Sequence, residues 1–105
     1  MSQVTVQNNW RAVCAELCSL QPKLERFGVR RLWLFGSRAR GDSRPASDWD
    51  FLVEFQQPPS FDDFMGLKLL LEDHVGCPVD LLSRQACSQR LLNAIRDQLV
   101  DVTQP

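Results

Sequence analysis

The 105-residue sequence lacks the features that mark several large classes of protein. It has no apolar run near the roughly 18 residues that a membrane-spanning helix needs, and residues 1–9 are polar, unlike a signal peptide. Its single histidine and four cysteines include no C-x-x-C pair, which argues against a zinc site of the usual spacing. Repeats, linkers and low-complexity tracts are missing as well. We therefore expect one cytoplasmic domain over residues 1–105, with free buried thiols and no membrane partner.

Excess charge is also absent, because 12 Lys and Arg oppose 13 Asp and Glu for a net charge of −1. Such a chain is a poor electrostatic binder of nucleic acid, so we expect no direct nucleic-acid partner. The cations are unevenly placed, however. Seven of the 12 lie in one stretch: Lys23, Arg26, Arg30, Arg31, Arg38, Arg40 and Arg44. This cluster suits a compact anion better than a long polyanion, although a solvated cationic face would look the same.

Hydrophobic periodicity predicts helices that alternate with strands. The predicted helices cover residues 9–20, a short turn through Leu24, 60–74 and 88–99. The predicted strands cover residues 29–35, 48–55 and 78–83. Ser60, with Asp63 three residues later, is expected to cap the helix over 60–74, and Gly76 is expected to end it. This order indicates an α/β domain in which helices cover a small sheet.

Residues 36–41 (Gly-Ser-Arg-Ala-Arg-Gly) are the first stretch with chemical meaning, because they follow a predicted strand. Glycines at both ends of such a turn let backbone amides approach a ligand. The hydroxyl of Ser37 and the guanidinium groups of Arg38 and Arg40 can bind phosphate oxygens. A Gly-Ser turn is also common between ordinary elements, so this turn alone leaves both interpretations open. It is neither a Walker A motif nor a dinucleotide fingerprint.

Asp48 and Asp50 form the second feature. The period of a strand puts both carboxylates on one face, with alpha carbons about 6.5–7 Å apart. Paired carboxylates stay ionised most easily near a cation, and hard oxygen ligands suit magnesium. Two solvated aspartates at the start of a strand are the alternative. The alternate residues from Trp49 to Phe55 are all apolar and already supply a core face, so we expect the Asp face to be free for a ligand.

Asp80 is the third feature, since it stands alone in an otherwise apolar predicted strand. Such an aspartate is costly to bury unless it meets a cation or hydrogen-bond donors. If residues 78–83 pair beside residues 48–55, Asp80 lies on the same face as the first two aspartates. Three carboxylates can hold two magnesium ions about 3.5–4 Å apart around one phosphoryl centre. Transfer at such a centre needs positioning and charge neutralisation rather than a protein nucleophile.

Together, residues 34–41, 47–53 and 79–81 resemble the minimal nucleotidyltransferase family of the polymerase-beta-like superfamily. Members of that family carry a G-S-x-A-R-G turn, a D-x-D pair and a third Asp on a later strand. The resemblance extends from about residue 20 to residue 100. It implies the nucleotidyltransferase fold, an α/β arrangement with a small mixed sheet of three or four strands flanked by about four helices.

The resemblance also implies a magnesium-dependent transfer from ATP. The site residues it implies are Gly36, Ser37, Arg38 and Arg40 for the nucleotide, and Asp48, Asp50 and Asp80 for catalysis and for two Mg²⁺ ions. The two glycines of the turn and Ser37 match the family motif, as do both arginines. Whether each arginine contacts phosphate or packs against the turn stays open.

Family members of this length are often the antitoxin of a two-protein system whose toxin is a helical HEPN ribonuclease. The resemblance therefore implies a protein adenylyltransferase that modifies a HEPN partner with AMP. The small size fits, because 105 residues leave little for an acceptor pocket, and without any tyrosine in the chain a tyrosyl acceptor must belong to another molecule. Two other functions remain open: a non-catalytic antitoxin that neutralises by occlusion, and transfer to a small molecule or to RNA ends.

Overall fold

The computed structural model describes residues 10–36 and 49–102 of the chain. Its helices are α2 (Trp10–Cys18), α3 (Gln21–Arg26), α5 (Phe61–Val75) and α6 (Gln89–Ile95), with short 3-10 turns η1 (Arg84–Ala86) and η2 (Arg96–Gln98). Its strands are β1 (Val29–Phe35), β2 (Trp49–Phe55), β3 (Val79–Ser83) and β4 (Val100–Asp101). The predicted α/β class is confirmed, and the sheet has four strands.

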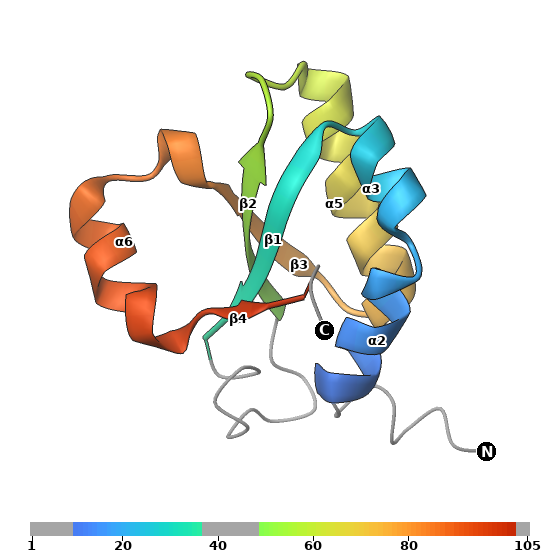
Figure 1. Cartoon of the computed structure of the whole chain (residues 1–105), viewed down its shortest axis with the longest axis horizontal. Helices are drawn as coiled ribbons and strands as arrows, with labels where there is room; N and C mark the ends of the chain where they lie inside the picture. Colours follow the sequence, from blue (N-terminus) through green and yellow to red (C-terminus); the bar gives the residue numbers. More distant parts are fainter. Residues whose placement is uncertain (1–9, 37–48, 103–105) are drawn as a thin grey trace.

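The sheet is mixed, with the strand order β3-β2-β1-β4. β1 runs antiparallel to both β2 and β4, whereas β2 and β3 are parallel. α2, α3 and α5 lie along one face of this sheet, and α6 lies on the opposite side (Figure 1). None of the helices in residues 10–36 and 49–102 has the length and apolar character that crossing a bilayer requires.

The main hydrophobic core lies between the sheet and α2, α3 and α5. Alternate residues of β2 all point into it, as the strand pattern predicted: Trp49, Phe51, Val53 and Phe55. The rings of Trp49 and Phe51 stack with centroids 6.3 Å apart. Leu67, Leu71 and Val75 cover them from α5 at helical spacing. Because one face of β2 is committed to this core, its remaining side chains must face the other side of the sheet.

The predicted signals at the ends of α5 are confirmed. The hydroxyl of Ser60 accepts a hydrogen bond from the backbone N–H of Asp63 at 3.0 Å, which satisfies one of the free amides of the first turn. Gly76 adopts the left-handed conformation (φ 72°), and its N–H bonds to the carbonyl of Glu72 at 2.8 Å. Pro22 lies in the first turn of α3, where its missing N–H has no consequence.

The prediction of one continuous helix over residues 88–99 is wrong. α6 ends at Ile95, η2 follows, and the chain turns extended at Leu99 (φ −70°, ψ 130°). Val100 then pairs with Leu34, and the N–H of Val102 bonds to the carbonyl of Leu32 at 3.0 Å. The edge of β1 offered these unpaired backbone groups, and pairing them outweighs continuation of a short helix.

Candidate active site

The candidate site lies at the end of the sheet where β1 stops and β2 and β3 begin (Figure 1). Asp50 of β2 is paired with Asp80 of β3 on one side and with Phe35 of β1 on the other. Paired residues of neighbouring strands point to the same face, about 4.7–4.9 Å apart. The predicted placement of Asp80 beside Asp50 on one face is therefore confirmed, while the role of the two carboxylates as metal ligands stays a prediction.

Gly36 follows the last residue of β1 and lies against the side chain of Asp50. Its φ of 81° lies in the left-handed region, and a Cβ added there would collide with the Asp50 carboxylate. Both observations disfavour a side chain at this position, because L-residues are strained at such angles and the Asp50 carboxylate would have to shift. The backbone that begins the predicted phosphate-binding turn thus lies in contact with a predicted metal ligand.

Gln98 is a residue of this site that the sequence did not indicate. Its side-chain oxygen Oε1 accepts a hydrogen bond from the backbone N–H of Gly36 at 3.2 Å, across 62 positions of sequence. The residue lies in η2, just before β4 pairs with β1. A glutamine at the end of an apparent helix carries no motif, so no sequence signal could have identified it. Gln98, near the C-terminus, therefore holds the first backbone amide of the turn in place.

Four of the predicted site residues lie outside the described residues: Ser37, Arg38, Arg40 and Asp48. The structure does place both ends of that stretch. Gly36 is held as above, and Trp49 is fully buried with its N–H bonded to the carbonyl of Pro78 at 3.3 Å. Of the predicted site residues, the described part of the chain therefore brings together Gly36, Asp50 and Asp80.

The donor set of Asp50 and Asp80 fits a divalent cation with hard oxygen preference. Both side chains are carboxylates, they lie in register on adjacent strands, and Asp80 is exposed to solvent while Asp50 is half-buried. Magnesium is commonly held by one or two such carboxylates together with substrate phosphates. A ligand that carries phosphate groups could approach this pair from the solvent side.

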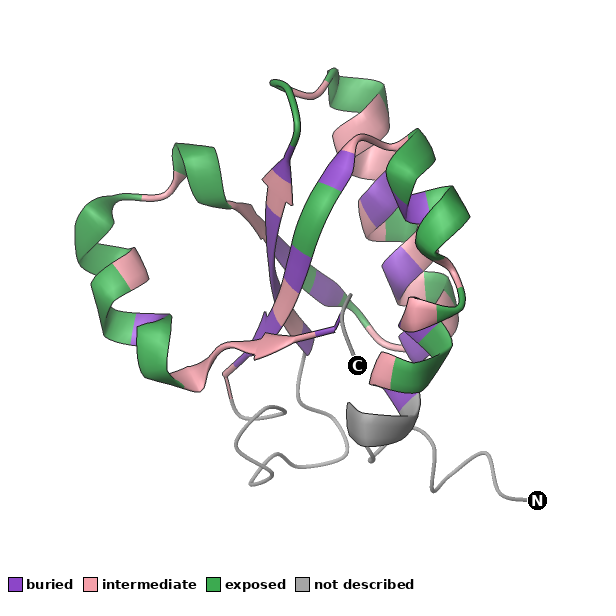
Figure 2. Ribbon diagram, in the orientation of Figure 1, coloured by how far each residue is buried: buried purple, intermediate pink, exposed green. Residues whose placement is uncertain are grey.

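The expectation that the whole Asp face is free for a ligand is wrong. Next to the acidic pair, the paired residues Trp33, Leu52 and Leu82 form an apolar row on the same face. Leu52 is fully buried in a second cluster that also contains Ile95 of α6. Hydrophobic burial favours covering this row, and Ile95 and Leu92 of α6 pack in the same cluster as Leu52, although Trp33 and Leu82 stay half-buried and most of α6 itself is exposed (Figure 2).

Comparison with known proteins shows the family of this chain. The sequence profile of the family described as polymerase beta, nucleotidyltransferase matches residues 19–100. Protein adenylyltransferase MntA of Thermococcus cleftensis is 37% identical over 78 residues, which are 74% of this chain and 79% of that protein. The chain belongs to the polymerase beta nucleotidyltransferase family. It is a nucleotidyltransferase, as the three motifs predicted.

Solved structures agree with the family in fold. A protein assigned as a minimal nucleotidyltransferase superimposes with a TM-score of 0.74 at 34% identity, covering 90% of this chain and 93% of the other. The complex of an MNT antitoxin with the tri-AMPylated HEPN toxin of Shewanella oneidensis gives a TM-score of 0.60 at 18% identity, over 85% of this chain and 71% of that one. The second likeness concerns the fold alone.

The four thiols of this nucleotidyltransferase are not among its predicted site residues. All four cysteines are free, as predicted, although each is half-buried rather than fully buried. Burial, together with the neighbouring Cys18 and Asp101, raises the pKa of the Cys14 thiol to about 11. Burial also raises the pKa of Cys87. Because the thiolate is the reactive form, the raised pKa makes these two thiols less reactive at neutral pH than a free cysteine.

Proposed function

We propose that this chain, as a single nucleotidyltransferase domain, transfers AMP from ATP to a hydroxyl group of a HEPN toxin and so acts as its antitoxin. The observation that carries the proposal is the pairing of Asp50 with Asp80 directly beside Gly36. A carboxylate pair next to a backbone turn is the arrangement that holds a metal-bound triphosphate. The name of the Thermococcus cleftensis relative supports adenylyl transfer to protein, and the AMPylated HEPN toxin supports the nature of the partner.

In this proposal each part of the site has one task. Gly36 and Ser37 bind the triphosphate, because a glycine turn presents amides and the serine adds a hydroxyl donor. Asp48, Asp50 and Asp80 would hold two magnesium ions, which would supply charge neutralisation to the triphosphate and would lower the pKa of the acceptor hydroxyl. The protein itself positions the α-phosphate and the acceptor.

The two arginines of the turn complete the proposed site. Arg38 and Arg40 contribute charge-assisted hydrogen bonds to phosphate oxygens, since a guanidinium group can meet two oxygens at once. They belong to the cation-rich stretch between residues 23 and 44. The remaining cations of that stretch in the described residues lie on α3 and β1, where Lys23, Arg26 and Arg30 are exposed.

Replacing one carboxylate tests the proposal. We expect Asp50→Asn to reduce AMP transfer to the partner at least about a hundredfold, because a lost metal ligand removes several kcal/mol of transition-state stabilisation. The matched control is Asp73→Asn, which changes an exposed aspartate on α5 and should leave transfer unchanged. Intact-mass spectrometry with ATP and magnesium measures AMP on each protein, separately and mixed.

Three outcomes would overturn the proposal, and one of them would establish occlusion. Full transfer by Asp50→Asn would contradict the assigned metal site. An Asp50→Asn protein that transfers nothing yet neutralises the partner as well as wild type would establish occlusion instead. AMP on the chain itself and never on the partner would refute the partner-modifying reaction. The acceptor could not then be a tyrosine, because the chain has none.

A further inference from the structure

β3 forms one edge of the sheet. The sheet pairing determines which of its residues direct their backbone N–H and C=O groups outward. In a parallel pair, alternate residues of each strand bond to the neighbour. The bond from the N–H of Trp49 to the carbonyl of Pro78 shows which residues these are, because it directs the backbone of an even-numbered residue toward β2. Even-numbered residues of β3 therefore direct their backbone groups toward β2, and odd-numbered residues direct theirs away from the sheet.

One end of this outer edge is closed by α5. The outward N–H of Val79 bonds to the Glu72 carboxylate at 3.1 Å, and Lys68 holds that carboxylate at 2.7 Å. These bonds lower the pKa of Glu72, with the Lys68 contact as the larger cause. Further along, the described residues provide no partner for the N–H and C=O of Leu81 or for the N–H of Ser83. The open part of the edge therefore runs from Leu81 to Ser83.

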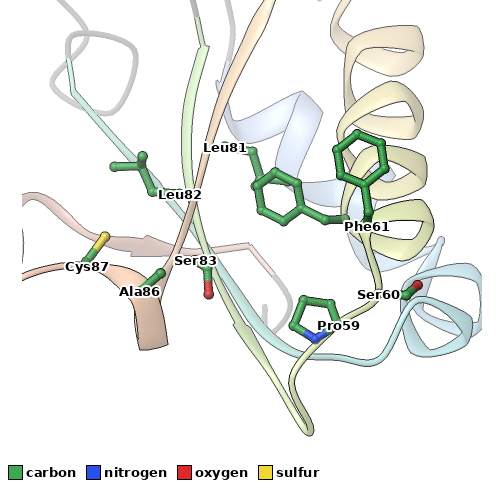
Figure 3. A pocket seen from close by; sticks show the side chains of 9 residues that line it. Pro59, Ser60, Phe61, Leu81, Leu82, Ser83, Ala86 and Cys87 are labelled. Atoms are coloured by element: carbon green, nitrogen blue, oxygen red, sulfur yellow. The ribbon is translucent and has the colours of Figure 1, made fainter.

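Apolar side chains flank the open edge on both faces of the sheet. A hollow of about 400 Å³ lies along it, bounded by α5, β3 and η1. Phe61 and Leu81 line it on the side of α5, whereas Leu82 and Cys87 line it on the other side of the strand (Figure 3). Phe61 is 77% exposed, which is unusual for a large aromatic side chain. Neither a charged side chain nor a proline protects this stretch between Asp80 and Arg84, as edges commonly are protected.

From this edge we infer that the acceptor segment of the partner protein docks in extended form along β3, as a fifth strand. The inference rests on the proposed function and adds how the acceptor reaches the site. Free backbone donors and acceptors beside an apolar hollow are the features that recognise an extended peptide, whose alternate side chains meet the apolar side chains on the two faces of the strand. A small molecule would leave the backbone groups of Leu81 unpaired.

The register of the sheet explains why docking here serves the reaction. A residue of the added strand that pairs with Asp80 must point to the same face as Asp80 and Asp50. Its hydroxyl oxygen then forms the bond to the α-phosphorus of ATP, the bond from that phosphorus to pyrophosphate breaks, and the hydroxyl proton passes to solvent. The flanking residues of the segment bond to Leu81 and fill the hollow beside Phe61. The chain has no tyrosine of its own to place there, so a tyrosyl acceptor comes from the partner.

Ser83 allows the outward amide to be removed without touching the acidic pair. Ser83→Pro deletes the N–H at a backbone φ of −86° that proline nearly matches, whereas Ser83→Ala keeps the N–H and loses only the hydroxyl. We expect the KM for acceptor to be about tenfold higher in Ser83→Pro than in Ser83→Ala, the ratio for one lost hydrogen bond. Affinity for the ATP analogue AMP-PNP and the melting temperature should be the same in both variants.

A synthetic peptide tests the same bonds from the other side with wild-type protein. The probe has a central tyrosine between alternating valine and threonine residues, and its control carries N-methyl groups on the two amides that flank the tyrosine. We expect AMP on the first peptide and an about tenfold higher KM for the methylated one. Hydrogen exchange at the amides of Leu81 and Ser83 should slow when the first peptide binds. The exposed Leu69 of α5 should show no change.

The following results would contradict strand docking along β3. Equal KM values for the two Ser83 variants, or for the two peptides, would mean that the outward amides bind nothing. Modification of the folded partner but never of the peptide would place the acceptor elsewhere, as would protection at Leu69 instead of β3. A dimer of the chain that Ser83→Pro alone dissociates would make a second copy the occupant. Failure of wild type to modify either acceptor would instead refute the proposed function.

Discussion

Gly36→Ala is the substitution whose effect the structure specifies best, because a matched control exists. Gly36 and Gly28 share the same φ of 81°, so alanine at either position meets the same backbone strain. Their surroundings differ. A Cβ at Gly28 would lie 4.0 Å from Cδ1 of Phe55, an ordinary contact, whereas a Cβ at Gly36 would collide with the Asp50 carboxylate. The difference between the two variants therefore isolates the displacement of Asp50.

The magnitudes follow from these two effects. Left-handed backbone costs an L-residue about 1–2 kcal/mol, so Gly28→Ala should lose roughly that much free energy of unfolding and Gly36→Ala at least as much, because its Cβ also displaces Asp50. For a domain of this size, this lowers the melting temperature by about 4–8 °C per kcal/mol. Gly28→Ala should keep its activity at temperatures where it is folded. Gly36→Ala should lose about a hundredfold in AMP transfer, since a shift of about 1 Å in a positioned group can have that effect.

Urea unfolding and single-turnover transfer with labelled ATP measure the two quantities separately. Equal activity in Gly36→Ala and Gly28→Ala would refute the close approach of the turn to Asp50 as a requirement of the reaction. A Gly28→Ala protein that is as inactive as Gly36→Ala would show that backbone strain, and not the position of Asp50, determines the loss.

Two further predictions concern the turn. Ser37→Ala should weaken binding of AMP-PNP by about 1.5–3 kcal/mol, the value of a hydrogen bond to a charged group, with little change in unfolding free energy; calorimetric titration beside urea unfolding checks this, and the opposite pattern would make the serine structural. Gln98→Ala should destabilise the fold by about 1 kcal/mol and raise the KM for ATP severalfold, because the Gly36 N–H loses its 3.2 Å partner. An unchanged KM in that variant would mean that the turn holds its geometry without Gln98.

Local signals made most of the secondary structure predictable. The alternation in residues 48–55, the Ser60 cap and Gly76 each determine conformation within a few residues, and all three are confirmed. The strand over residues 29–35 agrees with β1 as well. Such features depend on backbone sterics and on the nearest amides, which the sequence states directly.

The part that could not be predicted depends on distant partners. The helix predicted over residues 88–99 ends at Ile95, and Val100, for which no strand was predicted, pairs with the open edge of β1. The burial of Leu52 required the position of α6, which no periodicity gives. At the site, the motif spacing led to the shared face of Asp50 and Asp80, but the bond between Gly36 and Gln98 joins residues 62 positions apart. Long-range pairing of this kind leaves no local pattern.

The C-terminal strand has a consequence for how the enzyme is made. Gln98 bonds to Gly36, and Val102 bonds to Leu32, so the turn beside Asp50 is completed only after residues 98–102 have left the ribosome. Contacts of such sequence separation also form late in folding, since loop closure must come first. A nascent or truncated chain that ends before residue 98 should therefore carry both aspartates and still lack a finished nucleotide site. Synthesis itself then sets the moment at which this end of the sheet is first complete.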